Sequence, residues 1–235
     1  MHEDEILIIS DKADIERDAV AKVWHEKGGK VLRLGKFWQP PELDPCKVHV
    51  YGNDTFCLVL QQKLGFNLIS PPDDFLTGVD DAWLKRKISL LTLSDAKKLA
   101  FPTFLKSAVP KIFKASKYQT VDDLNQECTK LPDNTMVIHS EIVEFLSEAR
   151  AFVYNGTVLD CSVYEGSSEP KKAVKFITEF LSDVPGPKTF VLDLGEIAEK
   201  GWAIIEANAS WGAGLNGCNA EKVLPAIFHA TYCEV

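Results

Sequence analysis

Hydrophobic and polar positions predict strands that alternate with helices in the first part of the chain. Short apolar runs, which are typical of buried strands, occupy residues 5–10, 31–35, 48–52 and 66–70. Residues 14–28 have apolar positions at helical spacing, with Asp11 or Asp14 as the expected N-cap, and residues 55–64 follow the same period. Strands that alternate with helices favour a parallel α/β layer.

The pattern changes after residues 70–83, a proline-rich and acidic stretch that we interpret as a linker or surface excursion. Residues 91–102 then open the second half, with Ser94 as the expected cap of a short helix. Apolar strands are predicted at residues 101–106 and 135–143.

Two hairpins are predicted further along the second half. Residues 149–166 alternate around the dipeptide Asn155-Gly156, which is the strongest short hairpin signal. Residues 189–209 contain two more apolar runs, which we expect to pair through a turn near Gly201. The second half is therefore expected to hold antiparallel sheet.

Helices separate or follow these strands. They are expected over residues 121–131, 168–182 and 220–231. Thr120 and Asp123 have the spacing of a capping box for the first of these helices, and Ser168 is the expected cap of the second. The predicted fold class is α/β (α+β), a parallel layer followed by antiparallel sheet with helices.

Composition narrows the range of functions. The 235 residues have a net charge of -8, which argues against nucleic acid and membrane partners, and no apolar run reaches membrane-spanning length. The first ten residues are acidic, whereas a signal peptide begins with basic residues. Six cysteines without a CxxC pair indicate free thiols, and we expect a cytoplasmic protein. A homodimer is left open as its assembly state.

Oxygen-bearing side chains gather in the last predicted hairpin. Glu206 and Asn208 are two residues apart on a strand, so they face the same side, and Asp193 lies roughly opposite Asn208 on the partner strand. Carboxylates this close repel each other unless a cation lies between them, and oxygen ligands suit Mg²⁺. The alternative is a solvated hairpin end.

Basic side chains precede this hairpin in the sequence. Lys106, Lys111 and Lys114 supply ammonium groups that can neutralise phosphate oxygens, and Arg150 can bind one in bidentate fashion. A solvated basic face is the alternative, but Lys106 ends an apolar strand, where a lysine is costly to bury. The chain contains neither a P-loop motif nor a GxGxxG motif after its first strand.

Three stretches together resemble the ATP-grasp fold, and within it the small branch with two phosphate-site lysines and one arginine. They are FPTFLKSAVPKIFKA, HSEIVEFLSEARAFVYNGTVLDCSVYEG and VLDLGEIAEKGWAIIEANASWGAGLNG. The pattern of that branch corresponds here to Lys106, Lys111, Arg150, Asp193, Glu206 and Asn208, with residues 211–214 as a small-residue loop.

The resemblance covers roughly residues 95–235 and implies a division into domains. Residues 1–94 are expected to form a pre-ATP-grasp α/β domain, and residues 95–235 an ATP-grasp domain of two small antiparallel sheets with helices. Within the latter, residues 95–143 correspond to a lysine subdomain and residues 144–235 to a metal-binding subdomain.

The resemblance also implies where ATP and Mg²⁺ bind. Adenine is expected at backbone groups of the hinge 140–144, with Glu141 and Val143 at the base edge and Glu144 at the ribose hydroxyls. The phosphates are expected at the three lysines and the metal at the three oxygen ligands named above. His139, which precedes the hinge, is interpreted as a packed residue.

Ligation is the usual chemistry of the family. A substrate carboxylate attacks the γ-phosphate of ATP to give an acyl phosphate and ADP, and an amine then displaces phosphate to form an amide or peptide bond. The resemblance implies Arg150 and Lys111 as catalytic residues, with the loop 210–216 beside the acyl phosphate. The expected substrates are a small molecule, an amino acid or a peptide with a carboxylate, and an amine acceptor.

Two other functions stay open. A non-catalytic ATP-binding regulatory module would bind ATP without producing ADP, and an ATP-grasp kinase would transfer phosphate to a hydroxyl without releasing it. The chain departs from the family pattern at Ser107, at Val109-Pro110 and at Ala149. None of these positions is a predicted phosphate or metal ligand.

Overall fold

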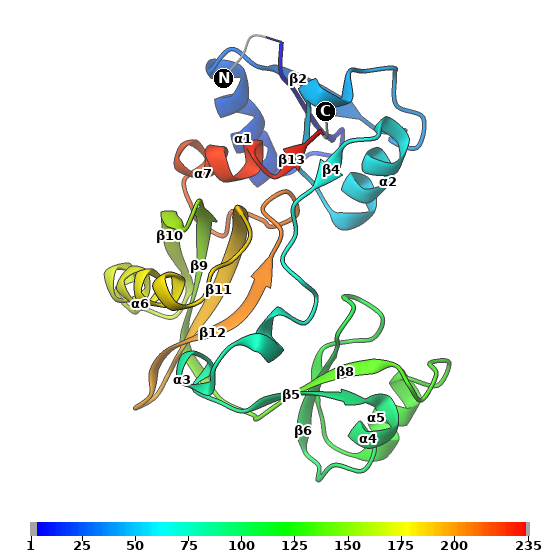
Figure 1. Cartoon of the computed structure of the whole chain (residues 1–235), viewed down its shortest axis with the longest axis vertical. Coiled ribbons are helices and arrows are strands. Elements are labelled where there is room, and N and C mark those ends of the chain that lie inside the picture. The colour runs from blue at the N-terminus through cyan, green and yellow to red at the C-terminus, as the bar shows by residue number, and fades with distance from the viewer. Residues whose placement is uncertain (1–3, 234–235) are drawn as a thin grey trace. The chain divides into compact units, whose positions relative to one another are not determined.

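The protein is seen in a computed structural model that describes residues 4–233. The chain forms two compact units (Figure 1). The first comprises Met1–Pro71, Ser147–Leu194 and Ala207–Val235, and the second comprises Pro72–Leu146 and Gly195–Glu206. Helices and small sheets occur in both, which confirms the mixed α/β class. None of the helices formed by residues 4–233 is both long enough and apolar enough to span a membrane.

The first unit begins with the predicted parallel layer. Its strands, in the spatial order β2-β1-β3, are β1 (Ile6–Ser10), β2 (Lys30–Leu34) and β3 (Val48–Val50). Helix α1 (Ile15–Glu26) follows β1, and its cap is Asp14, whose carboxylate accepts the backbone N–H of Arg17 at 2.9 Å. Helix α2 (Asp54–Leu64) follows β3 and ends at Gly65, which adopts the left-handed conformation.

The strand predicted at residues 66–70 does not join the parallel sheet. It is the short strand β4 (Asn67–Leu68), which pairs antiparallel with β13 (Thr231–Tyr232) at the other end of the chain. An apolar run alone cannot reveal this pairing, because the partner lies far away in sequence. The expected last helix is also shorter, since α7 (Ala220–Phe228) ends before β13.

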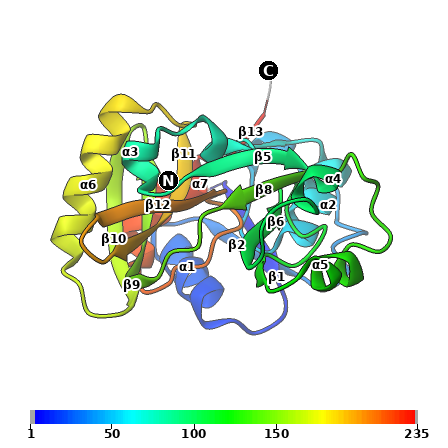
Figure 2. The same ribbon diagram turned by 90° about the horizontal axis from the view of Figure 1, so that it is seen from below.

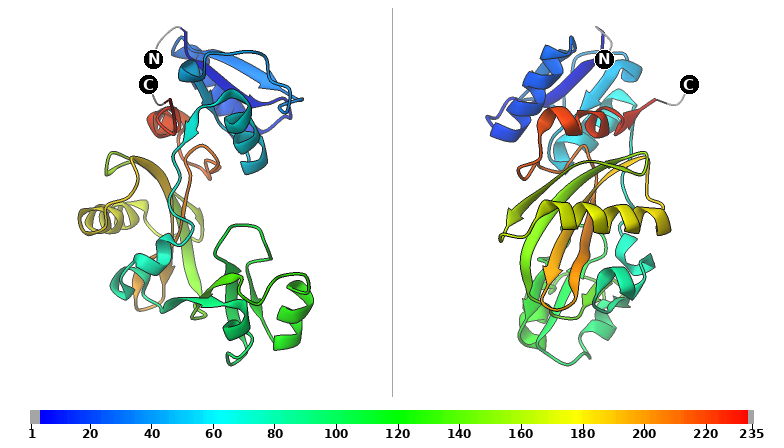
Figure 3. Two further views of the ribbon diagram at one scale, coloured as in Figure 1. Left: turned by 45° about the vertical axis from the view of Figure 1, so that its right-hand side comes forward. Right: turned by 90° about the vertical axis from the view of Figure 1, so that its left-hand side faces the viewer.

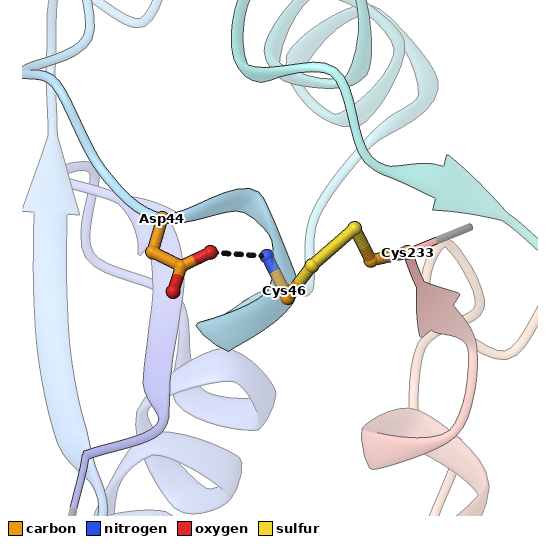
Figure 4. The surroundings of a disulfide bond; sticks show 3 residues. All are labelled: Asp44, Cys46 and Cys233. Atoms are coloured by element: carbon orange, nitrogen blue, oxygen red, sulfur yellow. Dashed lines mark hydrogen bonds between the residues drawn. A yellow bond between two sulfur atoms is a disulfide. The ribbon is translucent and has the colours of Figure 1, made fainter. Parts of the chain in front are cut away.

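A disulfide joins Cys46 to Cys233, so the expectation of free thiols is wrong for these two residues (Figure 4). Cys46 lies in the 3-10 turn η1 (Pro45–Lys47), where its backbone N–H donates to the Asp44 carboxylate at 3.0 Å, and Cys233 follows β13. The pairing of β13 with β4 holds the end of the chain in the first unit. The other four cysteines are free thiols, as expected.

Cys46→Ser is expected to lower the free energy of unfolding by about 2–5 kcal/mol, because the disulfide closes a loop of 187 residues in the unfolded chain. Urea denaturation in the presence and absence of a thiol reductant measures this effect. Reductant should destabilise the natural protein and leave Cys46→Ser unchanged. Cys161→Ser, which alters a free thiol, is the matched control. A protein whose stability does not respond to reductant would contradict the prediction.

The second sheet of the chain contains both predicted hairpins. In the spatial order β10-β9-β11-β12, its strands are β9 (Phe145–Tyr154), β10 (Thr157–Glu165), β11 (Thr189–Ile197) and β12 (Gly201–Asn208). Asn155 and Gly156, with φ of 48° and 70°, form the turn between β9 and β10. A turn before Gly201 joins β11 to β12. Both hairpin predictions are confirmed.

Helix α6 (Pro170–Asp183) lies across one face of this sheet and buries Ile177 and Phe180 (Figure 3). Ser168 does not cap it. The N-cap position is Glu169, and the hydroxyl of Ser168 donates instead to the hydroxyl of Ser147 at 2.9 Å. The cap prediction is wrong because a tertiary partner competes for the same hydroxyl.

The second unit contains a four-stranded antiparallel sheet. In the spatial order β5-β8-β6-β7, its strands are β5 (Ile88–Thr92), β6 (Thr103–Ser107), β7 (Ser116–Tyr118) and β8 (Met136–Ser140). Strand β8 ends before the predicted residue 143, and β5 was not predicted. A five-residue run carries little periodicity, so β5 is defined by its pairing with β8.

Short helices complete the second unit. They are η2 (Phe75–Gly78), α3 (Asp81–Leu84), α4 (Leu93–Ala96) and α5 (Val121–Glu127). Helices α4 and α5 lie together beside the sheet (Figure 2), and their apolar residues share a core with β6 and β8. The capping box of Thr120 and Asp123 is confirmed, whereas α4 is capped by Thr92 rather than by Ser94.

The predicted domain boundary between residues 94 and 95 stays a prediction. The compact units divide the chain elsewhere, because β5 belongs to the predicted first domain and yet pairs with β8 of the predicted lysine subdomain. The second unit also takes residues 195–206 from the last hairpin.

Candidate functional site

A buried ion pair lies at the centre of the candidate site in the first unit. Arg150 on β9 and Asp193 on β11 form two parallel hydrogen bonds, Nε to Oδ1 at 2.7 Å and NH2 to Oδ2 at 2.6 Å. The side chains are only 13% and 4% exposed. The bidentate contact holds the guanidinium in one plane, and it gives each charge a partner out of water.

Asn208 contacts the same carboxylate. Its Nδ2 donates to Asp193 Oδ2 at 3.0 Å, so the two residues expected to lie opposite each other in the last hairpin are neighbours. An amide that donates through nitrogen directs its carbonyl oxygen elsewhere, where it can accept a donor or contact a cation. The metal assignment of these two residues stays a prediction.

The loop after β12 is held by the first part of the chain. A further hydrogen bond of Arg150 runs from NH1 to the Gly214 carbonyl at 3.0 Å, and the Tyr51 hydroxyl donates to the Ala213 carbonyl at 2.8 Å. Burial, aided by the Glu16 carboxylate, raises the pKa of Tyr51, so this phenol remains a donor at neutral pH. The loop is therefore positioned by side chains that lie far from it in sequence.

The backbone N–H groups of this loop have partners within the protein. Leu215 and Asn216 donate to the Glu16 carboxylate at 2.9 and 2.7 Å, and Gly212 and Ala213 donate to the Ala209 carbonyl at 3.0 Å. We expected the loop to direct such groups at an acyl phosphate. In the structure these four are occupied, so that expectation is wrong for them.

In the second unit, Lys106 on β6 lies near Glu206 on β12, with 3.6 Å between Nζ and Oε2. Their side chains are 24% and 40% exposed, so the pair is accessible to a ligand. The structure thus brings a predicted phosphate lysine to a predicted metal carboxylate. Opposite charges are the arrangement that a metal–phosphate complex requires from its surroundings.

Lys111 and Lys114 lie on the exposed loop between β6 and β7. Lys111 has a φ of 66°, which is uncommon for a residue with a side chain, and Lys114 donates its backbone N–H to the Glu127 carboxylate at 3.0 Å. Their phosphate-binding and catalytic roles stay predictions.

The predicted hinge lies between β8 and β9, as expected, and has no regular secondary structure. The backbone N–H of Glu141 donates to the Lys87 carbonyl at 3.0 Å, and its carbonyl accepts the Ser140 hydroxyl at 3.0 Å. Glu144 is exposed and Val143 is partly buried. The nucleotide contacts assigned to these residues stay predictions.

His139 precedes the hinge and is partly buried, with Nδ1 at 3.3 Å from the Ser89 hydroxyl. Burial lowers its pKa, so the imidazole is neutral at physiological pH. This environment agrees with its interpretation as a packed residue.

Arg86 was not among the predicted residues. It lies beside the hinge in the second unit, is 7% exposed, and donates to the Ser140 hydroxyl and to main-chain carbonyls. Burial lowers the pKa of Arg86 to about 10, and the side chain remains charged at neutral pH. In sequence it is the middle residue of Lys85-Arg86-Lys87, which resembles a solvated basic run. Only burial distinguishes it from its neighbours.

The comparison with protein families gives one match. An ATP-grasp domain family, family 2 of the clade named for one arginine and two lysines, matches residues 83–226, which is more than half of the chain. The chain belongs to the ATP-grasp family. No protein with a curated function matches the sequence at a significant level.

Solved structures share the ATP-grasp fold at low sequence identity. A RimK domain ATP-grasp protein from Sphaerobacter thermophilus is 11% identical with a TM-score of 0.63, covering 95% of this chain and 99% of that one. The D-cycloserine synthetase DcsG is 14% identical with a TM-score of 0.58, covering 95% and 98%. A RiPP-associated ATP-grasp ligase from Chryseobacterium gregarium, solved with ADP and a leader and core peptide, is 13% identical with a TM-score of 0.57, covering 96% and 97%.

The oxygen ligands expected for Mg²⁺ in this ATP-grasp chain have suitable donor chemistry. Asp193, Glu206 and Asn208 offer carboxylate and amide oxygens, which are hard donors. Among residues 4–233, no three His, Cys, Asp or Glu side chains are grouped closely enough to hold a metal ion. Such a donor set fits a cation that keeps phosphate and water among its ligands, as Mg²⁺ does with nucleotides.

Proposed function

We propose that the chain is an ATP-dependent ligase that joins a carboxylate to an amine. The observation that carries this proposal is the contact of Arg150 with both Asp193 and the Gly214 carbonyl in an ATP-grasp fold. A guanidinium fixed in this way can stabilise negative charge that develops on an acyl group without reorganising. Ligases among the solved structures with this fold support the same reaction class.

The proposed reaction has two steps. A carboxylate oxygen of the substrate attacks the γ-phosphorus of ATP, the bond to the bridging oxygen breaks, and ADP leaves. The amine then attacks the acyl carbon, loses a proton and displaces inorganic phosphate. A side-chain nucleophile is not needed, because positioning and charge neutralisation supply most of the rate enhancement in phosphoryl transfer.

The predicted site residues receive roles in this proposal. Lys106, Lys111 and Lys114 neutralise the phosphates, the backbone at Glu141 and Val143 binds adenine, Glu144 binds the ribose, and Asp193, Glu206 and Asn208 hold Mg²⁺. Arg150 and Lys111 act on the transferred phosphate and the acyl group. When bound, Mg²⁺ supplies positive charge to the phosphate oxygens.

The proposed substrates are an amino acid, a peptide or another small molecule with a carboxylate, together with an amine acceptor. Two kinds of relative support this class: a synthetase for D-cycloserine and a ligase solved with a leader and core peptide. We also propose a cytoplasmic location, where ATP is available. The net charge of -8 favours small or basic substrates over nucleic acid.

Product analysis tests the reaction. Purified protein is incubated with Mg-ATP, with and without a cytosolic extract of small molecules and peptides, and nucleotides and phosphate are quantified. The proposal expects extract-dependent ADP with an equal amount of inorganic phosphate, and a joined product by mass spectrometry. AMP with pyrophosphate would contradict the acyl-phosphate mechanism. ADP without phosphate indicates a kinase, and ATP binding without any product indicates a regulatory module.

Lys106→Ala is expected to weaken ATP binding about 10- to 100-fold, since it removes a charged contact to phosphate. Calorimetric titration with ATP and Mg²⁺ measures the change. Lys117→Ala, which removes an exposed lysine from the neighbouring strand β7, is the matched control and should retain the natural affinity. Equal affinities of Lys106→Ala and the natural protein would make Lys106 a structural residue only.

A further inference from the structure

Arg86 is a buried cation whose partners in the described part of the chain are neutral oxygens. Its Nε donates to the Ser140 hydroxyl at 3.1 Å, and NH1 donates to the carbonyls of Leu84 and Ile204 at 2.9 and 2.8 Å. NH2 lies 3.5 Å from the Ile205 carbonyl. Burying a charge without a counter-ion is costly, so this position demands a reason beyond packing.

The partners of Arg86 lie at both ends of the hinge. Ser140 is the last residue of β8, and Phe145 is the first residue of β9. The guanidinium carbon lies 5.7 Å from the centre of the Phe145 ring, within range of a cation–π contact. The ring packs closely over the backbone of Gly195, where any Cβ would overlap it. Arg86 therefore contacts the chain on either side of the hinge.

A hydrogen-bond relay extends from Arg86 into the hinge itself. The Ser140 hydroxyl accepts from Arg86 and donates to the Glu141 carbonyl at 3.0 Å. A hydroxyl that accepts from a cation becomes a stronger donor, which fixes the carbonyl more firmly. The next residue, Lys87, bonds Glu141 twice: its carbonyl accepts the Glu141 N–H, and its N–H donates to the Glu141 carboxylate, both at 3.0 Å.

Arg86 also contacts the strand that carries the predicted metal ligand. Ile204 and Ile205, whose carbonyls face its guanidinium, directly precede Glu206 on β12. One side chain thus ties the hinge to β12 within the second unit. The planar fork of an arginine can make these divergent contacts together, whereas the ammonium of a lysine cannot.

We propose that Arg86 is a positioning residue that fixes the hinge for the adenine base, through Ser140 and the Glu141 carbonyl. The inference rests on the proposed function, because it assumes that the hinge binds adenine. It assigns to Arg86 an effect on the base of the nucleotide and none on the phosphates.

Binding of two ligands separates this role from a general structural role. The affinities of the natural protein and of Arg86→Lys are measured by calorimetry for Mg-ATP and for magnesium tripolyphosphate, which has phosphates and no base. Arg86→Lys is expected to bind ATP about tenfold more weakly, and to bind tripolyphosphate within about twofold of the natural protein. Arg33→Lys, at an exposed arginine of the first unit, is the matched control.

The other outcomes overturn the inference in distinguishable ways. An equal loss for both ligands makes Arg86 a general structural residue, and unchanged ATP affinity removes its effect on the hinge. Failure of the natural protein to bind ATP would refute the proposed function as well as this inference. If Arg86→Lys does not fold, Ser140→Ala replaces it: this variant breaks the relay and keeps the bonds of Arg86 to the carbonyls. It should weaken ATP binding about threefold and leave tripolyphosphate binding unchanged.

Discussion

Arg150→Ala is expected to abolish turnover and to lower the free energy of unfolding by about 3–5 kcal/mol. The substitution removes the bidentate partner of Asp193, whose side chain is 4% exposed, and leaves a carboxylate buried without its cation. It also releases the Gly214 carbonyl. Urea denaturation measures the stability, and ADP formation with the extract used to test the ligase measures the turnover.

A double variant separates the two effects. Arg150→Met combined with Asp193→Asn removes both charges, and it is expected to recover most of the lost stability because no buried charge is left unpaired. Its turnover should remain absent, since the guanidinium that acts on the acyl group is gone. Arg33→Ala, which breaks an exposed ion pair with Asp18, should change neither property appreciably. Normal turnover in the double variant would remove Arg150 from the mechanism.

Glu206→Gln is expected to lower kcat at least about 100-fold while leaving the fold unchanged. The substitution keeps the shape of the side chain and removes the negative charge that a Mg²⁺ site with few protein ligands depends on. The side chain is 40% exposed, and its pair with Lys106 has little effect on stability at that exposure. The rate of ADP formation as a function of Mg²⁺ concentration measures the effect.

The control for Glu206→Gln is Glu199→Gln, in the turn of the same hairpin, where the carboxylate is exposed. This variant should keep the natural rate and the natural Mg²⁺ dependence. An unchanged rate in Glu206→Gln would place the metal elsewhere. A rate that recovers fully at high Mg²⁺ would show that Glu206 sets metal affinity without contributing to the chemical step.

Local sequence was a reliable guide wherever the determinants are local. The Asn155-Gly156 turn and the capping box at Thr120 depend on residues within four positions of one another, and both formed as predicted. Ser94 and Ser168 failed as caps for the same reason in reverse. Thr92 begins α4 after a strand that only pairing reveals, and Ser168 bonds to a distant serine.

The candidate site divides along the same line. A motif order read from the sequence named Arg150, Asp193 and Asn208, and the structure shows them in contact. Glu16 and Arg86 carry no motif, and their importance follows from what lies next to them after folding. A carboxylate that binds two backbone N–H groups some 200 residues away has no signal in its own neighbourhood.

The sequence by itself determined the element types, the two hairpins, the ATP-grasp resemblance and the residue types of the site, because periodicity, turn chemistry and motif order are written in short segments. Only the tertiary structure decided the pairing of β4 with β13, the Cys46–Cys233 disulfide, and which polar groups are satisfied internally. These features join segments that are distant in sequence. Their free energy comes from burial and from partners that exist only once the chain has folded.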